Sequence, residues 1–261
     1  MLARLRVSFL AILLAVLLTS ALASTPTSPF PCTGGSVYFT AHTVDGLLFQ
    51  NPDLLHDLFV FKCVTTVVFN ADTGGEAANE SQSSTFYGQG YQAYGKETLK
   101  KLYSADIPAI SSTDGRNRYT VAELKDVVAT ILGFRRAKDI RVLDYVDSFS
   151  VTDTDDVQLE HADRVASAKI VVDAVREKGI PGTVKGYACD ALRNLKNNLH
   201  TPDYIKKFAA FFEYARHDPD MCQSLQECGD RLRKINAYTD DYDEGNHIYE
   251  FLKREYYASP A

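Results

Sequence analysis

Residues 36–70, SVYFTAHTVDGLLFQNPDLLHDLFVFKCVTTVVFN, decide the fold class. Residues 37–40 and 64–69 are rich in β-branched and aromatic side chains, a pattern typical of buried strands. Between them, Asn51-Pro52-Asp53 indicates a helix start with Pro52 at the first helical position. The apolar residues that follow, Leu54, Leu55, Leu58 and Phe59, share one helical face. We therefore predict a strand, helix, strand unit with parallel strands.

The same alternation continues along the chain. The pattern predicts a helix near 96–104, a turn or small hairpin at 106–120, a helix from Thr120 to about 137 with Glu123 closing a capping box, a strand at 140–145, a long helix at about 159–178, a strand near 184–187, and helices near 203–217 and 246–257. We expect a three-layer α/β sandwich with a mainly parallel, Rossmann-like sheet. The polar, glycine-rich residues 71–85 leave the carboxyl end of a strand, where such sheets bind ligands.

The N-terminal residues 1–23 have the order of a secretory signal peptide. Two arginines precede an apolar run at 7–18 and a small-residue cleavage site, Ala21-Leu22-Ala23. The run has about a dozen residues, fewer than the ~20 that a membrane-spanning helix needs. We expect a secreted chain with no membrane span, an extended lead-in at 24–35 and a single domain at 36–261. Its formal net charge of −6 and lack of a basic run argue against nucleic acid as a partner.

The five cysteines fit an oxidising compartment. Cys222 and Cys228 are close enough in sequence to close one short loop. Cys32 and Cys63 each precede a predicted strand, so both thiols reach the same sheet edge if those strands are parallel neighbours. We predict these two disulfides and a free Cys189, although Cys63 and Cys189 also suit small buried apolar positions. Asn79-Glu80-Ser81 is a glycosylation sequon.

Two short segments carry candidate chemistry. His42 and Asp45 follow the first predicted strand, whereas His161, Asp163 and Arg164 lie at the start of the long helix. Each segment places a histidine beside a carboxylate on an element directed toward the same sheet edge. A histidine and an aspartate three residues apart are common by chance, so the alternative is a loop histidine with ordinary hydrogen bonds.

The surrounding sequence resembles the LmbE/PIG-L family of zinc-dependent N-acetyl-sugar deacetylases. Residues 41–73 resemble the opening A-H-x-D-D-[DE]-L-L, N/S-P-D-L-L-H-D and C-V-x-T-V-x-x-T-A-G-D, and residues 160–175, EHADRVASAKIVVDAV, resemble D-H-[SP]-D-H-V-A. Residues 207–215, Asp218-Pro219, Cys222, Cys228 and 252–256 resemble the tail of the secreted fungal-type branch. The resemblance covers most of the chain in the right order and implies the LmbE-like fold.

The resemblance also implies a reaction. In the family, two histidines and an aspartate hold zinc, which leaves a position for water, and an acid takes a proton from that water to remove an acetyl group from N-acetylglucosamine. By position, His42 and Asp45 match zinc ligands. His161 matches the histidine that polarises the substrate carbonyl or stabilises the oxyanion.

The match fails at the base and at the third ligand. Val44 stands where the base belongs, and it cannot accept a proton. Arg164 stands where the third ligand belongs, and an arginine stays protonated. Gly46 and Asn70-Ala71-Asp72-Thr73 also depart from the family pattern. We therefore expect weak or absent zinc, impaired catalysis and a retained cleft for an N-acetylated sugar or glycan.

Two alternatives remain open at this point. One is a divergent, active zinc-dependent deacetylase with a rebuilt site, in which His161 becomes the third ligand and Asp163 or Asp72 the base. The other is a secreted interaction protein whose cleft is vestigial.

Overall fold

The computed structural model describes residues 29–70, 95–146, 160–235 and 247–258. Contacts divide the chain into two units, Met1–Pro31 and Cys32–Ala261, and all elements named below belong to the second. The helices described are α2 (Asp45–Leu48), α3 (Asp53–Phe59), α5 (Leu99–Tyr103), α6 (Val121–Arg135), α7 (Ala162–Lys178), α8 (Thr201–Ala215), α9 (Leu225–Ile235) and α10 (Ile248–Phe251), with the 3-10 helix η3 (Asp190–Asn194). None of these helices has the length and apolar character needed to cross a bilayer.

A five-stranded sheet forms the centre of the unit, in the order β2-β1-β5-β6-β7. Its strands are β1 (Ser36–Thr40), β2 (Val64–Val68), β5 (Asp139–Leu143), β6 (Thr183–Tyr187) and β7 (Tyr257–Ala258). The first four are parallel and β7 is antiparallel to β6. The predicted α/β class with a mainly parallel sheet is therefore confirmed.

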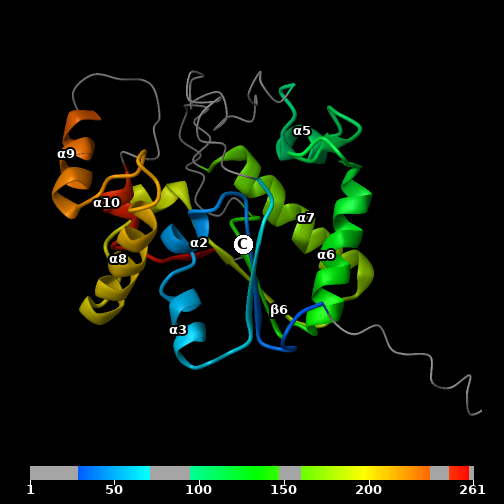
Figure 1. Cartoon of the computed structure of the whole chain (residues 1–261), viewed down its shortest axis with the longest axis horizontal. Helices are drawn as coiled ribbons and strands as arrows, with labels where there is room; N and C mark the ends of the chain where they lie inside the picture. The colour runs from blue at the N-terminus through cyan, green and yellow to red at the C-terminus, as the bar shows by residue number, and fades with distance from the viewer. Residues whose placement is uncertain (1–28, 71–94, 147–159, 236–246, 259–261) are drawn as a thin grey trace, which may run out of the picture. The chain divides into compact units, whose positions relative to one another are not determined.

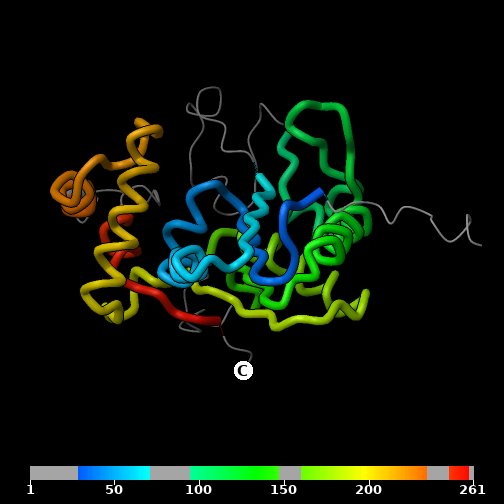
Figure 2. The backbone as a smooth tube through the Cα atoms, turned by 60° about the horizontal axis from the view of Figure 1, so that its bottom comes forward, coloured from blue at the N-terminus to red at the C-terminus, as the bar shows by residue number. Residues whose placement is uncertain are grey.

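Helices cover both faces of this sheet. Figure 1 shows α6 and α7 on one side and α2 and α3 on the other, with α8, α9 and α10 beyond α2. Helix α7 packs on both β1 and β5. Every residue of β1 is buried, because this strand lies in the interior of the sheet and is covered on both faces. The tube in Figure 2 shows the same separation of α6 from α2 and α3.

Local sequence signals place most elements correctly. Thr120 caps α6 and exchanges hydrogen bonds with Glu123, which is the predicted capping box. The expected small hairpin consists of β3 (Ile110–Ser111) and β4 (Arg118–Tyr119). At the start of α3 the prediction is one residue off, because Pro52 is the N-cap residue and follows a cis peptide bond.

The helix predicted near 246–257 is present but shorter than expected. Helix α10 ends at Phe251, and the chain then forms β7, which pairs with β6. The side chain of Lys207 donates to the carbonyl oxygens of Phe251 (2.9 Å) and Arg254 (2.6 Å), which engages carbonyls at and beyond the end of the helix.

Helix α9 was not predicted. Its signal in the sequence is Ser224 followed three residues later by Glu227, since the backbone N–H of Glu227 donates to Ser224 Oγ at 3.2 Å.

The described residues contain two disulfides, Cys32–Cys63 and Cys222–Cys228, and Cys189 is free and buried. These are the pairs expected from the sequence. The first lies just ahead of the parallel neighbours β1 and β2. There the buried Arg135 guanidinium also donates to the carbonyl oxygens of Cys32 and Cys63.

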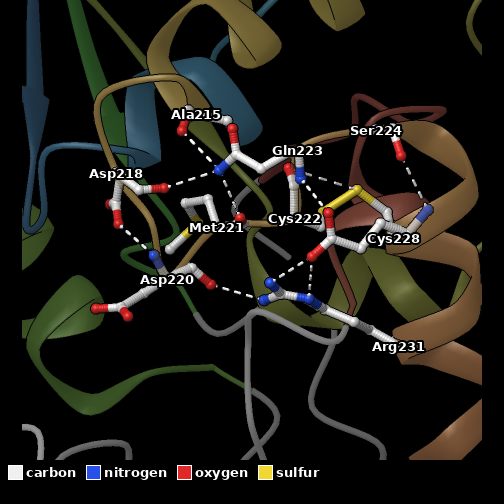
Figure 3. Close-up of a disulfide and its surroundings, with 10 residues drawn as sticks. Ala215, Asp218, Asp220, Met221, Cys222, Gln223, Ser224, Cys228 and Arg231 are labelled. Carbon is white, nitrogen blue, oxygen red and sulfur yellow. Dashed lines mark hydrogen bonds and ion pairs between the residues drawn. A yellow bond between two sulfur atoms is a disulfide. The ribbon is translucent and has the colours of Figure 1, made fainter.

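The second disulfide joins the segment after α8 to α9 (Figure 3). Beside it, Gln223 Nε2 donates to three carbonyl oxygens, including that of Ala215 at 2.7 Å. Arg231 on α9 bonds Glu227 (2.7 Å) and the carbonyl oxygen of Asp220 (2.6 Å). Side-chain hydrogen bonds therefore reinforce this covalent link. The sequon at Asn79 lies outside the described residues.

Candidate functional site

The parallel strands deliver polar side chains to one edge of the sheet. Asn70 follows β2, His42 follows β1, Asp144 follows β5 and Asp190 follows β6. Because the carboxyl ends of parallel strands meet at a common edge, these side chains approach one another and the start of α7. The structure brings His42, Asp45, His161 and Arg164 together at this edge.

Asp45 is buried and fully engaged with its neighbours. One carboxylate oxygen, Oδ2, accepts from the backbone N–H groups of Ala41 (3.0 Å) and His42 (2.7 Å). The other oxygen, Oδ1, accepts from Arg164 Nε at 2.8 Å. Burial raises the pKa of Asp45, but the Arg164 guanidinium and His42 outweigh it and hold this pKa well below its usual range. Asp45 is therefore a carboxylate at neutral pH.

Arg164 bridges two buried acids. It lies in the first turn of α7 with 1 % of its surface exposed. Besides its bond to Asp45, its Nη1 donates to Asp190 Oδ2 at 2.8 Å, and its Cζ lies 4.7 Å from the centre of the Phe49 ring. A buried guanidinium is tolerated when carboxylates neutralise it and an aromatic face covers it. Arg164 therefore provides a permanent positive charge to this edge of the sheet.

His161 is the N-cap residue of α7, and its Nδ1 accepts the backbone N–H of Asp163 at 3.1 Å. A neutral imidazole that accepts at Nδ1 carries its proton on Nε2. Burial, followed by the nearby His42 and Arg164, lowers the pKa of His161 well below its ordinary value. His161 is therefore neutral, and its Nε2 is a donor without a lone pair for a metal.

His42 lies beside these groups and is more accessible to solvent. Its ring packs edge-to-face on the His161 ring with 4.8 Å between centroids, and its Nδ1 lies 3.7 Å from Asp45 Oδ2. The side chain is 19 % exposed, whereas those of Asp45 and Arg164 are buried. Solvent, or a ligand, therefore reaches this cluster next to His42.

Glu160 and Asp190 belong to the same network and were not assigned a role from the sequence. The Glu160 carboxyl accepts the backbone N–H groups of Cys189 (3.1 Å), Asp190 (2.9 Å) and Ala191 (3.4 Å). Burial and then the negative charges of Asp190 and Asp144 raise the pKa of Glu160 to about 8. Asp190 Oδ2 also accepts the backbone N–H of His161 at 3.0 Å. A signal for Asp190 was available, since it is the first acid after the predicted strand at 184–187 and lies three residues beyond it.

Asp163 and Val44 bear on whether a base is present. Asp163 is buried, and its carboxyl accepts the backbone N–H of Lys100 (3.0 Å) and the Asn70 amide (3.4 Å), so it joins α5 to the sheet edge. Burial raises its pKa. Val44 is buried within the hydrophobic core. Asp72, the other base of the rebuilt site, lies outside the described residues.

The residues present do not fit a zinc ion. A guanidinium takes one oxygen of Asp45, backbone N–H groups take the other, and His161 carries a proton on Nε2. Zinc needs ligands with lone pairs. Within the described ranges, no group of three or more His, Cys, Asp or Glu side chains is placed to hold a metal ion. The guanidinium supplies the positive charge that these carboxylates require.

Comparison of the sequence with models of known protein families and with curated proteins finds no match.

Proposed function

We propose that this chain is a secreted protein with a deacetylase-like fold that binds an N-acetylated sugar without hydrolysing it. The observation that carries the proposal is the buried bridge from Asp45 through Arg164 to Asp190. Hydrolysis of an amide needs an activated water and a base. Here the guanidinium of Arg164 already pairs with Asp45, so this carboxylate is not open to a metal ion. The residue at the family's base position is the buried Val44.

The same groups are suited to binding. A neutral imidazole with its proton on Nε2 is a hydrogen-bond donor of the kind that recognises a carbonyl oxygen, such as that of an acetamido group. Arg164 keeps its own positive charge without depending on pH and stays paired with Asp45 and Asp190, because a guanidinium does not lose its proton in proteins. The two disulfides are compatible with an oxidising extracellular environment. The resemblance of residues 41–73 and 160–175 to sugar deacetylases supports the choice of ligand.

The test is calorimetry of the purified chain with chitin oligomers, with and without a chelator, together with an assay for released acetate. We expect binding that the chelator does not change, and no acetate. Chelator-sensitive acetate release would instead show a divergent deacetylase. The absence of both binding and release would show a vestigial cleft.

A His161→Asn variant locates the ligand. Asparagine is a good N-cap residue, so it preserves the cap of α7 but removes the imidazole donor. Loss of one hydrogen bond to the ligand is expected to weaken binding by roughly tenfold. His56 is exposed on α3, so His56→Asn is the matched control and is expected to bind like the unmodified chain. Equal affinities for all three proteins would contradict this assignment.

A further inference from the structure

Four consecutive apolar side chains project into solvent at the end of α3. We call Leu58, Phe59, Val60 and Phe61 the apolar tip; all are exposed, with Phe59 at 62 % and Phe61 at 96 %. The turn that contains them connects α3 to β2 and lies at the lower end of α3 in Figure 1, and Figure 2 shows the same connection. Soluble proteins rarely display several large apolar residues together without a partner.

The backbone of the apolar tip has its own hydrogen bonds. The N–H groups of Val60, Phe61 and Lys62 donate to the carbonyl oxygens of His56 (3.1 Å), Leu58 (3.1 Å) and Asp57 (2.9 Å). These donors are satisfied within the turn, so their transfer into a medium without water loses no hydrogen bonds. Phe61 reaches the end of the turn in a left-handed conformation, with φ of 54°, which is unusual for an aromatic residue.

Ion pairs and a disulfide fix the residues that directly follow the apolar tip. Lys62 Nζ pairs with Asp57 (3.2 Å) and Asp139 (2.5 Å), and Asp57 accepts from Ser36 and Tyr38 on β1. The next residue, Cys63, is joined to Cys32. Lys62 is thus neutralised by its two acids. At the rim of the apolar tip the exposed Lys206 of α8 has its Nζ 5.3 Å from the centre of the Phe59 ring.

We infer that the apolar tip inserts into the surface of a zwitterionic phospholipid membrane. Four such side chains expose on the order of 500 Å², since a large aromatic side chain has about 150–250 Å². The positive charge of Lys206 complements the negative phosphate of the lipid headgroup. Its long aliphatic chain allows the ammonium group to remain among the headgroups while the apolar tip is inserted. The net charge of −6 favours neutral over anionic lipid.

The chain contains no tryptophan, so one introduced at the apolar tip reports on that position alone. With the mature protein from Ser24 onward, Phe61→Trp is expected to give blue-shifted emission on addition of phosphatidylcholine vesicles, and quenching by lipids brominated in the acyl chains. Val127→Trp, at an exposed position of α6, is the control and is expected to show neither effect. Unchanged emission of Phe61→Trp at saturating lipid would overturn the inference.

Cosedimentation measures the energetic contribution of the two phenylalanines. The double variant Phe59→Ser with Phe61→Ser is expected to lower the partition coefficient for vesicles tenfold or more. The free energy of burying a single phenylalanine side chain already corresponds to a change of about that size. Val68→Ser with Val127→Ser removes exposed apolar surface elsewhere and is expected to leave it unchanged. If the unmodified protein instead forms a dimer that the serine variant dissociates, the occupant is a second copy and the inference is wrong.

Discussion

Arg164 is the residue on which the chemistry of the site depends. Its guanidinium is shared between Asp45 on one side and Asp190 on the other, each at 2.8 Å. Such a planar group pairs with two carboxylates at once, which a lysine ammonium cannot do with the same geometry. Asp45 remains charged in the interior because this cation lies beside it. An internal salt bridge therefore joins α7 to the residues that follow β1 and β6.

Removal of Arg164 is expected to destabilise the fold strongly. Arg164→Met leaves Asp45 and Asp190 buried without their cation, and loss of one partner of a buried ion pair typically costs about 3–5 kcal/mol. Urea denaturation measures this change in the free energy of unfolding.

The matched control lies on the same helix. Arg176 also pairs with an aspartate, Asp173, but its side chain is 72 % exposed. Exposed pairs contribute at most about 1 kcal/mol, so Arg176→Met is expected to have a small effect. Similar small losses for both variants would show that the buried bridge does not stabilise the protein.

At the scale of the elements, the two disulfides fix different parts of the fold. Cys32–Cys63 spans 31 residues and closes the loop that contains β1, α2 and α3, whereas Cys222–Cys228 spans only 6. A cross-link stabilises by reducing the freedom of the unfolded chain, and the effect grows with loop length.

The two pairs therefore provide controls for each other. Replacement of Cys32 and Cys63 by serine is expected to lower the free energy of unfolding by about 4 kcal/mol, and replacement of Cys222 and Cys228 by about 2 kcal/mol. Denaturation of the two double variants under identical conditions measures the difference. A larger loss from the shorter loop would contradict this entropic account.

Elements with local signals could be predicted from the sequence, and elements that depend on distant partners could not. The capping box of Thr120 and Glu123 lies within four residues, and it identified the start of α6. The strand β7 has two residues, and it exists because Tyr257 and Ala258 pair with Tyr187 and Gly186 of β6, which are distant in sequence. The residues next to β7 in the sequence carry no signal that distinguishes this strand from the end of a helix.

At the scale of the whole molecule, the parallel sheet assembles the site. A mainly parallel sheet that contains the strands at 37–40, 64–69 and 140–145 was enough to expect His42 and Asp45 at a common edge with the start of α7. The partners of Arg164 could not be foreseen, because Asp45 lies 119 residues away and Asp190 joins the network only through the end of β6. The protonation of His161 likewise depends on a bond made at the start of a folded helix.

The most direct test of this account is the zinc content of the purified chain after equilibration with zinc and dialysis. Arg164→His serves as the comparison, since it places an imidazole nitrogen with a lone pair, a possible metal ligand, beside His42 and Asp45. We expect no zinc to remain with the unmodified chain, whereas Arg164→His retains zinc and gains thermal stability from it. Stoichiometric zinc in the unmodified chain would contradict the claim that the ion pairs of Arg164 leave these residues unfit for a metal ion.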